Sequence, residues 1–194
     1  MLKIAQIQML KVTFLMMLDE IQTGNGRTGK YFAYQHTNII PDVMTTAKGL
    51  GNGFPVGAVM TQGKAVGLLG AGSHGSTYGG TVLGSRVVYT VLDTLEKENA
   101  VENAATIGAY IVDQLRAELI DQNVQVRGFG MMIGIQLPKD CAELVAIARD
   151  EYKLIINVTA GSVVRLLPPL NMTQTQADEL LQRLVPVIKN FLTA

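Results

Sequence analysis

The sequence predicts an α/β fold, followed after residue 122 by a smaller α+β unit. Up to that residue, short apolar runs alternate with helical patterns, as in sheets covered by helices. Beyond it, apolar residues at 131, 133, 135 and 137 alternate with other residues, which is typical of a half-buried strand. We place the boundary near Asn123, at the end of a long helix, and expect domains at 1–122 and 123–194.

The first part contains three predicted strands. The continuous apolar run at 14–18 predicts a buried strand, because strands covered on both faces lack polar alternation. Further strands are expected at 43–47 and 57–61, and glycine-rich or small-residue loops at 24–29, 48–55 and 73–80. Apolar residues at helical spacing then predict two helices, running about 82–95 and 104–119. Residues 1–13 show no clear pattern.

Two capping signals predict helix starts in the second part of the chain. Asp140 with Glu143 predicts a helix start, and that helix is expected to reach about Tyr152. Thr173 with Gln176 predicts the start of the last helix, in which Pro186 is expected to cause a kink or break. Short strands are expected between the two helices, at 154–158 and 162–167.

Composition excludes several functional classes. The 194 residues are 48% hydrophobic, and sixteen basic residues balance sixteen acidic ones, which disfavours a dedicated nucleic-acid binder. The single cysteine, Cys141, excludes an internal disulfide framework and fits a reducing cytoplasm. We find no clear signal peptide and no apolar run near the roughly eighteen residues of a membrane span. His36 and His74 lack partners at metal-ligand spacing, so no metal site is expected.

Two residues that follow predicted strands could carry chemistry. Asp19 ends the first strand, at the sheet edge where open α/β sheets bind ligands, although a helix cap or a surface turn explains it equally well. Lys48 follows the second strand and precedes three closely spaced glycines. A buried, neutral lysine amine could attack a ligand carbonyl to form a Schiff base. A solvated loop lysine is the alternative.

Three further features have both a functional and an ordinary explanation. Ser76 and Thr77 precede a helix, where they could hold a phosphate or act as an N-cap. Arg165 lies inside an apolar strand, so it either meets an anionic partner or points outward. Residues 24–29 match the dinucleotide pattern G-x-G-x-x-G, but residues 20–23 separate them from the strand, so a dinucleotide-binding module is a remote alternative.

Together these segments resemble the class III aminotransferases. The resemblance rests on LDEIQTG and GRTG at 18–24 and 26–29, PDV at 41–43, AKGLG and GFP at 47–51 and 53–55, HGSTYGG at 74–80, and VRLLPPL at 164–170. Within the family, FAY at 32–34 and INV at 156–158 are most similar to the acetylornithine branch, with the ornithine branch next.

The resemblance implies a pyridoxal phosphate enzyme of fold type I, with residues 1–122 in the large domain and 123–194 in the small one. Lys48 would form the Schiff base with the cofactor and move the proton, while Asp19 would pair with the pyridinium nitrogen. Gln22 would lie near the phenolic oxygen, and Ser76 and Thr77 at the phosphate, Thr77 from the neighbouring subunit of a homodimer. Arg165 would clamp a substrate carboxylate. The implied substrates are an ω-amino compound such as N-acetylornithine and 2-oxoglutarate.

The chain also departs from the family pattern. Family members are longer, and their N-terminal half, with its Gly-Thr/Ser-Glu-Ala phosphate cup, has no counterpart here. Residues 1–13 do not match the helix that precedes the Asp19 strand, and Thr81 stands where asparagine is usual. We therefore expect a C-terminal fragment with an open sheet edge, an uncovered apolar face and weak activity alone. The alternative is a catalytically silent remnant, or an interaction partner of a full-length aminotransferase.

Overall fold

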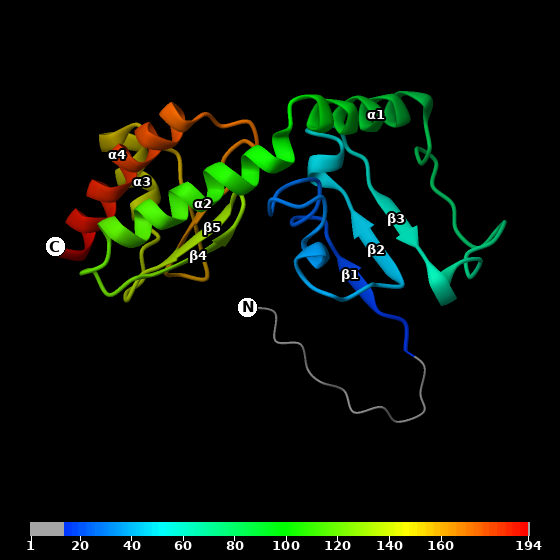
Figure 1. The fold of residues 1–194 in the computed structure, drawn as a ribbon, viewed down its shortest axis with the longest axis horizontal. Helices are drawn as coiled ribbons and strands as arrows, with labels where there is room; N and C mark the ends of the chain where they lie inside the picture. The colour runs from blue at the N-terminus through cyan, green and yellow to red at the C-terminus, as the bar shows by residue number, and fades with distance from the viewer. Residues whose placement is uncertain (1–13, 194) are drawn as a thin grey trace.

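The computed structural model describes residues 14–193 and confirms the α/β fold (Figure 1). Residues 1–13, for which no element was predicted and which did not match the family's helix, lie outside the described part, as does Ala194. The strands and α-helices in chain order are β1 (Met17–Asp19), β2 (Val43–Thr46), β3 (Ala58–Thr61), α1 (Val82–Lys97), α2 (Ala100–Glu118), β4 (Gln125–Phe129), β5 (Met132–Gln136), α3 (Leu144–Tyr152), β6 (Asn157–Thr159), β7 (Val163–Leu166) and α4 (Gln174–Thr193).

The first sheet has the order β1-β2-β3. Strand β1 runs parallel to β2, with Asp19 opposite Thr45, whereas β3 runs antiparallel to β2. Because the carboxyl ends of parallel strands meet at one edge, Asp19 and the residues that follow β2 lie at the same end of the sheet. This end carries the candidate chemistry.

The predicted burial of residues 14–18 is wrong. Phe14 is 69% exposed and Met17 is 66% exposed. The physical reason is the position of β1 at the end of the sheet, where, among the described residues, it pairs with β2 alone. An apolar run can indicate a strand, but burial depends on what packs against that strand. The expected open, apolar sheet edge is therefore present in the described structure.

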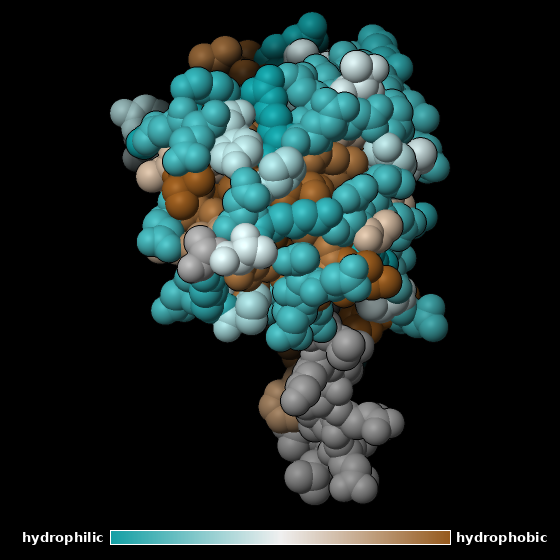
Figure 2. Space-filling view, turned by 90° about the vertical axis from the view of Figure 1, so that its left-hand side faces the viewer, coloured by the Kyte–Doolittle hydropathy of each residue, from teal (hydrophilic) through white to brown (hydrophobic). Residues whose placement is uncertain are grey.

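The second sheet has the order β4-β5-β7-β6, and every neighbouring pair is antiparallel. Helices α2, α3 and α4 contribute to the core that lies against it, with Ile111, Leu115, Leu144 and Leu184 fully buried. Strand β4 was not predicted, because Val126 is its one buried residue. In Figure 1, α2 extends from beside the first sheet to this core. The side of the molecule that Figure 2 shows is mainly hydrophilic. The domain boundary near residue 123 stays a prediction.

One of the two predicted helix caps is confirmed. Thr173 and Gln176 bond reciprocally, with Gln176 N donating to Thr173 Oγ1 (3.3 Å) and Thr173 N donating to Gln176 Oε1 (2.9 Å). The predicted Asp140–Glu143 cap is wrong, since α3 begins after Glu143 with no side-chain cap. The preceding backbone is held from elsewhere in the fold, because Cys141 N donates to Gly161 O at 2.9 Å.

The break considered at Pro186 is not found, because α4 continues from Gln174 to Thr193 with the proline inside it, and a kink there stays a prediction. Proline removes one helical hydrogen bond. The neighbouring Leu184, Val185, Val187 and Ile188 are all buried. Their packing holds the helix across the missing bond, since tertiary burial supplies most of a helix's stability in a folded protein.

The glycine loop (residues 24–29) packs closely against the second half of the molecule. A Cβ atom on Gly29, whose φ is +79°, would lie 2.8 Å from Ala105 Cβ on α2. A Cβ atom on Gly130 would lie 2.5 Å from Gly29 N. Close packing therefore explains these glycines. The loop also leads into a 3-10 helix, Ala33–His36, rather than an α-helix, which removes the support for a dinucleotide-binding module.

Arg27 joins this loop to the second sheet. Its Nη1 donates to Met131 O at 3.3 Å and also to Pro168 O, while Met131 N donates to Arg27 O at 2.9 Å. Burial lowers the pKa of the guanidinium, although this side chain remains charged at any ordinary pH. The contact fixes how the loop after β1 meets the segment that follows β7.

We predict that Arg27→Met lowers the free energy of unfolding by about 2 kcal/mol, because it removes charged donors from two carbonyls. Methionine preserves part of the apolar stem. The matched control is Arg149→Met, since the Arg149 side chain is 62% exposed and bonds its chain neighbour Asp150. The control should change stability by less than about 0.5 kcal/mol. Urea unfolding of the full chain measures both, and equal losses would contradict the role given to Arg27.

Candidate active site

An open cleft of about 960 Å³ lies between the two halves of the molecule. Its walls come from the glycine loop, the residues after β2, one face of α1, and β7 with the segment that follows it. Gln22, Lys48 and Arg165 all line it, although they lie far apart in the sequence. The fold therefore brings these three predicted site residues to one cavity.

Lys48 directly follows β2 and begins a short 3-10 helix, Lys48–Leu50. Its backbone is in the left-handed region, with φ +47°. The glycines that follow allow a tight turn: a Cβ atom on Gly51 would lie 2.1 Å from Phe54 O. The side chain is exposed, so the burial considered for its amine is not found in the described chain. Lys48 can meet a ligand that enters the cleft.

Asp19 lies beside this region at the end of β1. Its Oδ1 accepts hydrogen bonds from Ile21 N at 2.9 Å and from Thr45 Oγ1 at 3.2 Å. These contacts fix the carboxylate between the two parallel strands. Asp19 is not part of the cleft wall, but Ile21 and Gln22, the residues that follow it, are.

Arg165 approaches the cleft from β7, where it lies opposite Gly134 and Asn157. Its side chain is half-buried, and its Nε is buried with no hydrogen-bond partner. Within residues 14–193 it forms no ion pair, so the anionic partner considered from the sequence is not supplied by the described chain. A buried donor without a partner is costly, and a bound anion would satisfy it.

Ser76 and Thr77 are not brought to the cleft. Both lie in the exposed loop before α1, and neither belongs to the cleft wall. The N-cap of α1 is Thr81, whose Oγ1 accepts a hydrogen bond from Gly84 N at 3.3 Å. The helix-cap explanation for Ser76 and Thr77 is therefore wrong. The loop leaves both hydroxyl side chains exposed.

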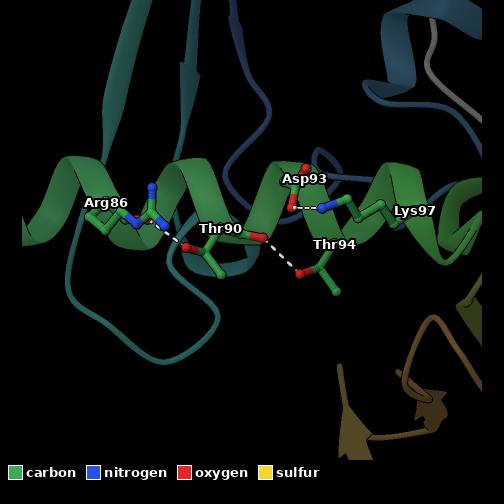
Figure 3. A network of polar contacts seen from close by, with 5 residues as sticks. All are labelled: Arg86, Thr90, Asp93, Thr94 and Lys97. Atoms are coloured by element: carbon green, nitrogen blue, oxygen red, sulfur yellow. Dashed lines mark hydrogen bonds and ion pairs between the residues drawn. The ribbon is translucent and has the colours of Figure 1, made fainter.

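Helix α1 contributes a polar wall that the sequence did not reveal (Figure 3). Arg86, Thr90 and Thr94 recur at helical spacing and line the cleft. Thr90 Oγ1 donates to Arg86 O at 2.9 Å, and Thr94 Oγ1 donates to Thr90 O at 2.8 Å. Both threonine hydroxyl groups therefore donate to carbonyl groups of the helix backbone. Arg86 thus adds a cation to the wall that already holds Lys48 and Arg165.

The other end of this network is a surface ion pair. Lys97 Nζ lies 2.8 Å from Asp93 Oδ2, four residues earlier on α1. The hydrogen bond and the negative charge of Asp93 raise the pKa of the Lys97 amine. Exposed pairs of this kind add little stability, so Lys97 has no evident role in the cleft.

Sequence reasoning also missed two buried polar residues near the glycine loop. Glu20 is 3% exposed and accepts hydrogen bonds from Ala33 N at 3.0 Å and Tyr34 N at 2.8 Å. Asn25 is 5% exposed and donates to Thr46 Oγ1 at 2.9 Å. The available signal was their polarity, with Glu20 directly after the first strand and Asn25 inside the glycine loop. Their partners, however, lie on other parts of the chain.

Neither Cys141 nor the possible metal ligands among residues 14–193 form a second site. Cys141 is fully buried, and burial raises the pKa of its thiol, so it is protonated and part of the core, as expected. Among residues 14–193, no cluster of three or more His, Cys, Asp or Glu side chains could hold a metal ion. No helix in this part of the chain is long and apolar enough to cross a membrane. The cytoplasmic location stays a prediction.

Solved structures share this fold. Ornithine aminotransferase from Plasmodium yoelii matches with a TM-score of 0.85 and 34% identity, covering 91% of this chain and 48% of that protein. Acetylornithine aminotransferase from Elizabethkingia anophelis matches with a TM-score of 0.84 and 30% identity, covering 91% and 46% respectively. A structure of ornithine aminotransferase from Toxoplasma gondii has partial occupancy of pyridoxal phosphate at its active site.

Comparison of sequences also finds aminotransferases. Acetylornithine aminotransferase from Nitrosomonas europaea is 45% identical over 181 residues, which cover 92% of this chain and 46% of the relative. Acetylornithine aminotransferase 1 from Bordetella parapertussis is 46% identical with the same coverage. The chain thus spans about half the length of these relatives. The model of the family described as aminotransferase class-III matches residues 4–188. The chain belongs to the class III aminotransferase family, whose members are pyridoxal phosphate-dependent transaminases.

Proposed function

We propose that this chain is part of an acetylornithine- or ornithine-type aminotransferase. It would move an amino group from an ω-amino compound, such as N-acetylornithine, to 2-oxoglutarate. The observation that carries the proposal is the meeting of Lys48 and Arg165 in one cleft, from two different sheets. We also propose that residues 1–122 belong to a cofactor-binding domain and 123–194 to a small α+β domain.

The residues present fit pyridoxal phosphate. A lysine amine lines the cleft, a carboxylate lies at the same end of the first sheet, and Gln22 lies between them in the chain. When bound, the cofactor stabilises the electron pair left on a substrate carbon after proton loss. Asp19 would hold a proton on the pyridinium nitrogen, and Gln22 would donate to the phenolic oxygen. The Asp19 carboxylate is already oriented by Ile21 N and Thr45 Oγ1.

Lys48 would hold the cofactor and move protons. Its amine would bind the cofactor aldehyde until the substrate amine replaces it. The freed Nζ would then take the proton from the substrate carbon and return it to the cofactor carbon. The exposure of Lys48 to the cleft allows this exchange, since the amine must be reached by an incoming substrate.

Arg165 would bind a substrate carboxylate. A planar guanidinium suits bidentate pairing with a carboxylate, and its buried Nε lacks a partner within the described chain. Binding a carboxylate there would satisfy that donor. The same contact would orient the substrate amine or carbonyl toward Lys48 across the cleft.

Ser76 and Thr77 would bind the cofactor phosphate in the neighbouring subunit of a homodimer. Their exposure in a loop away from the cleft of their own chain supports this placement. Backbone N–H groups and hydroxyls together form the kind of site that phosphates occupy.

A catalytically silent chain that binds a full-length aminotransferase is the second candidate. The exposed apolar residues at the edge of the first sheet favour it, with Phe14 and Met17 both more than half exposed. Such a surface is typical of a binding interface. This candidate predicts association with no turnover by the chain alone.

We expect the full chain with pyridoxal phosphate to transfer ¹⁵N from labelled N-acetylornithine to 2-oxoglutarate. Mass spectrometry of the glutamate formed measures the transfer. Lys48→Ala should abolish it, because no other lysine of the described chain lines the cleft and could move the proton. Lys64→Ala, which removes an exposed lysine in the 3-10 helix Gly63–Ala65, is the matched control and should retain it. Absence of labelled glutamate with the wild-type chain would favour the silent candidate.

Arg165→Gln should raise the KM for 2-oxoglutarate by about 10- to 100-fold, because a charged hydrogen bond to the substrate is lost. The matched control is Arg127→Gln on β4, an exposed arginine that bonds Gln125 Oε1 at 3.4 Å. Initial rates at varied 2-oxoglutarate concentration measure both KM values. Equal KM values for the two variants would refute the assignment of Arg165.

A further inference from the structure

The backbone of Lys48 adopts an unusual conformation. Its φ of +47° lies in the left-handed region. Residues other than glycine, asparagine and aspartate seldom adopt this conformation. Such conformations persist where surrounding contacts determine them, and they cluster at functional sites. A specific contact should therefore hold the peptide that enters Lys48.

The side chain of Asn25 supplies that contact. Its Nδ2 donates to Ala47 O at 3.2 Å and to Thr46 Oγ1 at 2.9 Å. The Ala47 carbonyl belongs to the peptide bond that directly precedes Lys48, so a donor on this oxygen fixes the orientation of that peptide. Leu50 N also donates to Ala47 O, at 3.0 Å, and closes the turn from the other side.

Asn25 is itself tightly placed. It is 5% exposed, and its own φ of +56° is one that asparagine tolerates better than most residues. Gly49 leaves the space that it occupies, since a Cβ atom there would lie 3.2 Å from Asn25 Cβ. Asn25, Lys48 and Gly49 all line the cleft. The amide thus ties the glycine loop to the backbone that presents Lys48.

We propose that Asn25 is a positioning residue, which orients the Ala47–Lys48 peptide so that the Lys48 amine is presented to the cleft. The inference rests on the proposed function of Lys48. It requires the donor N–H of Asn25, and not only its volume, because the Ala47 carbonyl can accept a hydrogen bond but cannot donate one.

Asn25→Asp tests this requirement, because aspartate has a similar size and also tolerates the left-handed region. The Thr46 hydroxyl can turn and donate to the new carboxylate, whereas the Ala47 carbonyl loses its donor. The probe is pyridoxal phosphate with borohydride reduction, followed by peptide mapping. The rate of labelling at Lys48 is divided by that at the exposed Lys64 in the same sample. We expect the ratio to fall about tenfold, while a general loss of stability would not single out Lys48.

Thr46→Val provides a second variant in case Asn25→Asp does not fold. It removes one of the two acceptors of the Asn25 amide and leaves the bond to Ala47, so the labelling ratio should fall about two- to threefold. A ratio equal to that of the wild type in whichever variant folds would overturn the inference.

Hydrogen exchange separates this inference from the proposed function. In Asn25→Asp, the Leu50 amide should exchange faster than in the wild type, because the turn around Ala47 O loosens. If wild-type Lys48 is labelled no faster than Lys64, the proposed function of Lys48 fails. The exchange rate of the Leu50 amide then tests by itself whether Asn25 orients the turn. Faster exchange in the variant supports the role of Asn25, and unchanged exchange overturns it.

Discussion

The packing of the glycine loop against the second sheet is the contact on which the cleft depends. Lys48 follows β2 of the first sheet and Arg165 lies in the second sheet, so the distance between them depends on how the two parts of the molecule pack. Arg27 connects the two parts through the Met131 and Pro168 carbonyls, and Gly29 and Gly130 allow the backbones to approach. The cleft between Lys48 and Arg165 therefore depends on the contacts that hold the glycine loop against the second half of the molecule.

Local patterns predicted most elements of the fold, and failed where distant contacts decided the outcome. The reciprocal bonds of Thr173 and Gln176 involve residues three apart, so the sequence alone could reveal them. The start of α3 instead depends on Gly161, which lies well beyond it in the chain. Burial of residues 14–18 was predicted from apolarity, yet exposure is set by the number of neighbours that a strand has. Strand β4 has a single buried residue and therefore no distinctive periodicity.

In the candidate site, too, local patterns identified some residues and distant contacts determine the others. Lys48, Gln22 and Arg165 were identified by motif and by resemblance, and the fold brings them to one cleft. The roles of Arg27 and Asn25 were not predicted, because their partners, Pro168 and Ala47, lie in other segments. The glycine pattern at 24–29 left a dinucleotide-binding module as a remote alternative, and close approach of the loop to α2 explains Gly26 and Gly29 instead. Residues that orient a reactive group are therefore harder to find by sequence than the group itself.

The most direct measurement is a crystal structure of the full chain grown with pyridoxal phosphate. If the cleft is the cofactor site, continuous electron density should run from Lys48 Nζ into the cleft, with the ring nitrogen toward Asp19. The Arg165 guanidinium should remain free to face a substrate carboxylate. Density for the cofactor on another lysine, or an ordered cleft without any, would contradict the assignment of this cleft as an aminotransferase site.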